Sequence, residues 1–155
     1  DSTTNTIATT TTVKGTATRR DSSTSDIDEK STQTVTGLAK GSTQRTINGA
    51  SAGSETTNGK SADGAFTSKR VAGDTITNLV IPNPSSSTTP PYPTAGTVIR
   101  SISVTVTLAG QAATTHARRE VVTYDGSATA RVVITQDGTT QNCTLPLPRG
   151  RLTCQ

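Results

Sequence analysis

The residues of this chain whose chemistry is easiest to test are a group of carboxylates, one histidine and two cysteines. Asp26, Asp28 and Glu29 lie close together in the acidic stretch DSSTSDIDEKS, and closely spaced carboxylates on a loop suit calcium. The stretch lacks the glycine and the distal glutamate of an EF-hand loop. The sequence therefore predicts a solvated loop over 21–31, with calcium binding as the alternative, and we expect no metal and no cofactor.

The single histidine, His116, is the natural candidate for a general base. It lies in QAATTHARRE, where Glu120 is the nearby carboxylate and no serine or cysteine occupies a recognisable nucleophile turn. The sequence also contains no phosphate loop, dinucleotide fingerprint or zinc-protease motif. The sequence therefore predicts that His116 faces solvent and that the chain is not an enzyme.

Four arginines and a net charge of +4 raise the question of an acidic partner. They are Arg118, Arg119, Arg149 and Arg151. Proteins that bind single-stranded nucleic acid stack bases on aromatic side chains, and this chain has one Phe, two Tyr and no Trp. We therefore expect no nucleic-acid partner, and we assign the arginines to strand edges and ion pairs.

Cys143 and Cys154 enclose the short segment LPLPRGRL. An even number of cysteines in a loop-rich, threonine-rich chain favours a disulfide and an oxidising, extracellular location. Two reduced cysteines are the alternative. Zinc binding is not expected, because two cysteines and a distant histidine do not make a set of four ligands.

The elements that must position these residues are predicted to be β-strands. Thirty-five Thr and 16 Ser make up about a third of the chain, and β-branched threonine suits strands. Apolar and polar residues alternate in TVIRSISVTVTLAG, and Asp125-Gly126 and Asp137-Gly138 predict tight hairpin turns. The expected core of this antiparallel meander consists of Ile102, Val104, Val106, Leu108, Val132 and Ile134.

The first half of the chain is poor in apolar side chains. Residues 1–70 contain seven Val, Ile, Leu or Phe, whereas the 59 residues from Thr97 onward contain 14. So few apolar side chains cannot offset a backbone entropy cost of about 1–2 kcal/mol per residue. We therefore expect this half to be ordered by the C-terminal meander or by neighbouring copies of the chain.

Residues 1–20 alternate weakly, which predicts an extended strand that can add to the open edge of the next copy. A first strand in the chain's own sheet, or a disordered leader, is the alternative. One face of this donor-strand candidate carries Ile7, Thr9, Thr11, Val13, Gly15 and Ala17.

Composition divides the chain into four parts. Residues 1–31 are an extended N-terminal strand and loop, and 32–81 are threonine-rich short strands, three or four of them within 32–69. Residues 82–96 form a Pro/Ser linker with five of the seven prolines, and 97–155 form the meander with its C-terminal disulfide. The expected fold class is all-β: an antiparallel sheet or β-sandwich with an extended threonine-rich N-terminal segment.

Several phrases of the sequence resemble Thr- and Gly-rich secreted or surface proteins of environmental bacteria. They are TINGASAGSETT, RVAGDT, RREVVTYDG and NCTLPLPRGRLTC, within residues 32–155. This resemblance implies export without naming an activity. The chain is more distantly similar to pilin heads that end in an antiparallel sheet and a C-terminal disulfide loop, and to pilins with an N-terminal donor strand. It departs from the former by lacking their long apolar helix, and from the latter by the late position of its cysteines.

These observations predict an extracellular structural subunit at the cell surface. Its copies are expected to assemble through β-strand edges into a filament, a pilus-like fibre or a surface layer. We expect no membrane span, since no run of 18 apolar residues is present. The alternative is a monomeric secreted adhesion or glycan-binding module that meets glycan or another cell surface.

Overall fold

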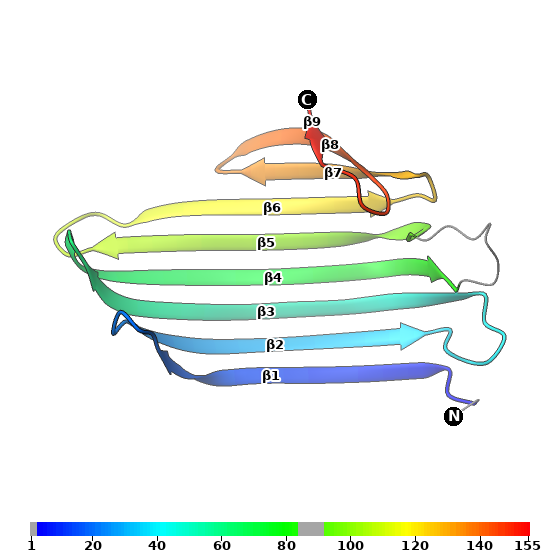
Figure 1. Ribbon diagram of the computed structural model, residues 1–155, viewed down its shortest axis with the longest axis horizontal. Coiled ribbons are helices and arrows are strands. Elements are labelled where there is room, and N and C mark those ends of the chain that lie inside the picture. The colour runs from blue at the N-terminus through cyan, green and yellow to red at the C-terminus, as the bar shows by residue number, and fades with distance from the viewer. Residues whose placement is uncertain (1–2, 84–91) are drawn as a thin grey trace.

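The computed structural model describes residues 3–83 and 92–155, which form one antiparallel sheet. Its nine strands follow the chain in the order β1 to β9, and they lie side by side in a single layer (Figure 1). The prediction of an all-β antiparallel fold is confirmed. The sandwich version does not form, because the described residues contain no second sheet to pack against the first.

Most strands are long. They are β1 (Thr6–Thr18), β2 (Thr24–Thr36), β3 (Gln44–Ser61), β4 (Gly64–Pro82), β5 (Ala95–Leu108), β6 (Thr114–Tyr124), β7 (Thr129–Gln136), β8 (Thr139–Pro146) and β9 (Thr153–Cys154). At about 3.4 Å per residue, the 19 residues of β4 span roughly 60 Å. Strands of globular proteins rarely exceed about ten residues, so the strands of this sheet are unusually long.

The predicted loop over 21–31 is wrong for residues 24–31, which belong to β2. The prediction of three or four short strands over 32–69 is also wrong, because Asn48-Gly49 and Asn58-Gly59 lie inside β3. Neither glycine has the positive φ that such a hairpin turn requires. Gly59 instead leaves space for the ring of Phe66, which lies directly opposite on β4 and would contact a Cβ at that position.

The two faces of the sheet differ in composition, because successive side chains of a strand point to opposite sides. We call one side the apolar face, after a row that crosses five strands: Ile76, Val98, Val122, Val132 and Cys143. We call the other the threonine face, after a parallel row: Thr77, Thr97, Thr123, Arg131 and Thr144. This division follows the alternation predicted from the sequence.

A bulge in β4 keeps the apolar face continuous. Ile47 and Gly49 of β3 are two residues apart, whereas their partners Leu79 and Ile76 are three apart. The extra residue is accommodated at Asn78, which has a positive φ of 47° and whose backbone N–H donates to the Asn48 side chain at 2.7 Å. The bulge therefore places Leu79, 9% exposed, on the same face as Ile76.

The main buried cluster lies at the C-terminal end of the sheet, on the apolar face. It consists of Val122, Ala130, Val132, Ile134 and Cys143. Leu145 and Leu147 pack against it, and the predicted disulfide between Cys143 and Cys154 is confirmed with an S–S distance of 2.04 Å. The disulfide ties β9 to β8 beside this cluster.

The rest of the predicted core is less buried. Ile102, Val104 and Leu108 of β5 are half-buried, and Val106 is 37% exposed. They share the apolar face, as the alternation predicts, but in a one-layer sheet the described residues place no second layer over them. Val132 and Ile134 are more buried because Leu145 and Leu147 of the C-terminal segment pack against their cluster.

The predicted Pro/Ser linker, 82–96, connects two neighbouring strands. Pro82 ends β4 and Ala95 begins β5, which pairs with β4, while residues 84–91 lie outside the described residues. Within the described parts of the chain, no helix is long and apolar enough to cross a membrane.

Candidate functional site

The free edge of β1 is the most extensive unpaired feature of the described sheet. β1 contains the donor-strand candidates predicted from the sequence: Ile7, Thr9, Thr11, Val13, Gly15 and Ala17. It pairs with β2 of its own sheet along its whole length, from Thr6 opposite Thr36 to Thr18 opposite Thr24. All 13 of its residues are exposed, and among the described residues no strand lies on its other side.

The β1–β2 turn shows which backbone groups of β1 point away from the sheet. The Arg19 backbone N–H donates to the Ser23 carbonyl at 2.9 Å, so this odd-numbered pair is a hydrogen-bonded pair. Such pairs alternate along an antiparallel ladder, and therefore the odd residues of β1 bond to β2. The N–H and C=O groups that point outward belong to Thr6, Ala8, Thr10, Thr12, Lys14, Thr16 and Thr18.

The opposite edge of the sheet is stepped and partly covered. β9 pairs with Cys143 and Thr144 of β8, and the Gln155 backbone N–H donates to the Asn142 carbonyl at 3.1 Å. Where β7 ends, Asp137 covers Ala117 of β6: its carboxylate accepts the Ala117 N–H at 2.7 Å, and its own N–H donates to the Ala117 carbonyl at 2.9 Å. The two edges of the sheet are therefore very different.

The Asp137 carboxylate also meets His116 at 3.0 Å from Nδ1. The Ala117 N–H, and then His116, hold the pKa of Asp137 below its usual value. The His116 side chain is 72% exposed, which agrees with the prediction that it faces solvent. Glu120, the carboxylate near His116 in the sequence, pairs with Arg118 at 3.6 Å instead, so the carboxylate that meets the histidine is Asp137.

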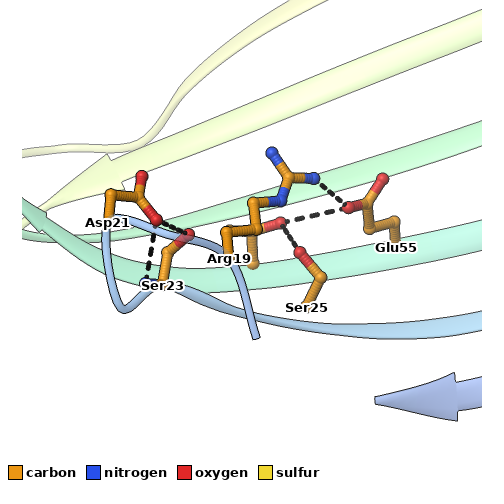
Figure 2. A network of polar contacts seen from close by, with 6 residues as sticks. Arg19, Asp21, Ser23, Ser25 and Glu55 are labelled. Carbon is orange, nitrogen blue, oxygen red and sulfur yellow. Dashed lines mark hydrogen bonds and ion pairs between the residues drawn. The ribbon is translucent and has the colours of Figure 1, made fainter. Parts of the chain in front are cut away.

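A network of polar side chains holds the β1–β2 turn against β3 (Figure 2). The Arg19 guanidinium lies 2.6 Å from Glu55, and Thr57 hydrogen-bonds to both Ser25, at 2.7 Å, and Glu55, at 3.4 Å. Ser25 is fully buried, so its hydroxyl needs this partner. The network fixes the end of β1 relative to the rest of the sheet.

Removing the charge of Glu55 is expected to weaken this network by about 1 kcal/mol, given the solvent exposure of the Arg19 side chain. Hydrogen bonding from Ser25, and then Arg19, lowers the pKa of Glu55 despite partial burial. A carboxyl whose pKa is lowered by folding stabilises the fold at pH values above its unfolded pKa of 4.5. This stability is lost as the pH falls through the folded pKa. Urea denaturation from pH 7 to pH 3 should show a smaller acid loss in Glu55→Gln than in the wild type.

Glu29→Gln is the matched control for that measurement, because Glu29 is an exposed carboxylate on the same face of the neighbouring strand. It should lose stability with acid as the wild type does. Identical acid profiles for Glu55→Gln and the wild type would show that the network does not contribute.

The three carboxylates considered as calcium ligands do not converge. Asp28 pairs with Lys14 at 3.0 Å, and Asp26 accepts a hydrogen bond from Thr16 at 2.8 Å. Both lie on the threonine face, whereas Glu29 points to the opposite face because it is one residue further along β2. No group of three potential metal ligands occurs among the described residues.

The four arginines are also separated by the fold. Arg118 and Arg119 are consecutive in β6 and therefore point to opposite faces. Arg149 and Arg151 lie in the exposed segment between β8 and β9. The structure does not gather them into one basic surface.

Comparison of the chain with protein-family models, with curated proteins and with solved structures finds no match in any of the three.

Proposed function

We propose that this chain is an extracellular structural subunit whose copies associate through their sheets, as in a filament, a fibre or a surface layer. The observation that carries the proposal is the size of its exposed surface. The chain exposes 10115 Å², whereas a compact folded chain of 15.9 kDa exposes about 7,400 Å². The excess is larger than the roughly 800 Å² that each partner buries in an ordinary protein interface.

Apolar side chains on both faces support the same proposal. Ile7, Val13 and Val106 of the apolar face are 49%, 48% and 37% exposed, and Val71 and Val133 of the threonine face are 47% and 37% exposed. A single layer leaves both faces in water. A fold with so small a buried core has a low free energy of unfolding. A neighbouring copy would remove these side chains from water, so association supplies burial that one chain lacks.

The disulfide supports the extracellular part of the proposal. Cys143 and Cys154 are bonded to each other, and no free cysteine occurs in the described chain. Structural disulfides form and persist mainly in oxidising compartments outside the cytoplasm.

Sedimentation velocity and negative-stain microscopy of the purified, oxidised protein test self-association. We expect species larger than the 15.9 kDa chain at micromolar concentration, and a melting temperature that rises with protein concentration because association stabilises the fold. A monodisperse monomer with a concentration-independent melting temperature would contradict the proposal and would favour the monomeric adhesion or glycan-binding module.

A further inference from the structure

We propose that β1 pairs antiparallel with β1 of a second copy, about a two-fold axis that passes beside Thr12. The result is one continuous sheet with twice the nine strands of the single chain. This inference rests on the proposed self-association and specifies its surface, its register and its symmetry. It also differs from donation of β1 into another copy's sheet, because β1 stays paired with its own β2.

The backbone of β1 is suited to pairing with itself. Its outward N–H and C=O groups all belong to even-numbered residues, so two antiparallel copies can pair even residues with even residues. The register that uses the whole strand places Thr6 opposite Thr18, Ala8 opposite Thr16 and Thr10 opposite Lys14, with Thr12 opposite Thr12. In this register all seven outward-pointing residues of each copy find a hydrogen-bonding partner.

The side chains agree with this register. Residues opposite each other in a ladder share a face, so the apolar face of one copy continues into that of the other. Val13 would lie opposite Thr11, and Ile7 opposite Ala17, which gives both exposed apolar side chains new neighbours across the axis. Lys14 meets Thr10 rather than another lysine, and it is already paired with Asp28, so no like charges oppose each other.

The other edge of the sheet is a poor partner for β1. Pairing of β1 with it would be head to tail, and it would set an uninterrupted 13-residue strand against an edge interrupted by Asp137 and β9. Pairing of β1 with β1 joins two identical, uninterrupted edges, and an isologous interface uses the same surface on both copies. It also closes the β1 edge, so larger assemblies need the sheet faces or the opposite edge of each copy.

Two proline substitutions in the full-length protein test the pairing. Thr12→Pro removes an outward N–H and leaves the β1–β2 hydrogen bonds intact, as proline on a sheet edge can do. We expect at least tenfold weaker dimerisation with an unchanged circular dichroism spectrum. Thr11→Pro is the matched control on the neighbouring residue, because its N–H points to β2; it should lower the melting temperature.

A cysteine crosslink tests the register without disturbing the backbone. Thr12 lies opposite itself across the axis, with Cα atoms about 5.5 Å apart in a hydrogen-bonded pair, within disulfide range. Thr12→Cys should therefore form a covalent dimer under mild oxidation. Thr10→Cys should not, because two copies of residue 10 lie about 14 Å apart along the strands.

The outcomes separate this inference from the proposed function. If the wild type is monomeric, both fall. If it associates, but Thr12→Pro associates as strongly and Thr12→Cys crosslinks no faster than Thr10→Cys, self-association stands and the β1 interface is overturned. Loss of association in Thr12→Pro together with selective crosslinking at residue 12 supports the interface and its register.

Discussion

Replacing Val132 by alanine is expected to lower the free energy of unfolding by about 2–3 kcal/mol. The substitution removes two methyl groups, each worth roughly 0.8 kcal/mol in transfer, and leaves a cavity that adds to the loss. Val132 is 1% exposed and lies at the centre of the buried cluster with Val122, Ile134 and Cys143. Urea denaturation followed by circular dichroism measures the change.

Val133→Ala is the control for that experiment. Val133 is the next residue in β7, but it points to the threonine face and is 37% exposed. Truncation of Val133 should lower the free energy of unfolding by less than about 1 kcal/mol, because its exposed side chain buries less apolar surface on folding than that of Val132. Equal losses for the two variants would contradict the assignment of the core to the apolar face.

Removing the disulfide is expected to cost about 3 kcal/mol. Cys143 and Cys154 are 11 residues apart, and a crosslink that closes a loop of this length stabilises mainly by restricting the unfolded chain. The double variant Cys143→Ala with Cys154→Ala should therefore unfold at lower urea concentration than the oxidised wild type. Alanine suits position 143, which is 5% exposed within the apolar cluster.

A reductant distinguishes loss of the crosslink from loss of packing in the same experiment. Dithiothreitol should lower the stability of the wild type toward that of the double variant and leave the double variant unchanged. If reduction has no effect on the wild type, the disulfide does not hold the C-terminal segment as proposed.

The features that follow from neighbouring residues were predictable. Asp137-Gly138 forms the expected tight turn, with φ of 48° and 84° at its two residues, since both tolerate positive φ. The disulfide was predictable from the number and setting of the cysteines. The strand over 1–20 was also predictable, but its outward-facing backbone groups were not, because they follow from the hydrogen bond between Arg19 and Ser23.

The errors arose where a local signal competed with pairing between strands. Asn48-Gly49 favours a turn, yet it lies within β3, where Gly49 pairs between Gln33 and Ile76. The acidic residues of 24–31 suit a loop, yet β2 receives backbone hydrogen bonds from strands on both sides. The gain from two complete ladders outweighs the modest strand propensity of these residues.

The sequence by itself therefore determined the kind of local structure: strands that alternate in polarity, the tight turn at Asp137-Gly138 and the C-terminal disulfide. These depend on backbone preferences and on residues close along the chain. The tertiary structure decided that the strands of residues 3–83 and 92–155 form one layer and leave β1 as an open edge. The order of the strands follows the chain, but the number of layers depends on whether the sheet packs against a second one, which the threonine-rich pattern does not determine. The physical reason is that main-chain hydrogen bonds join the strands whatever their side chains, whereas only the few apolar residues distinguish one packing from another.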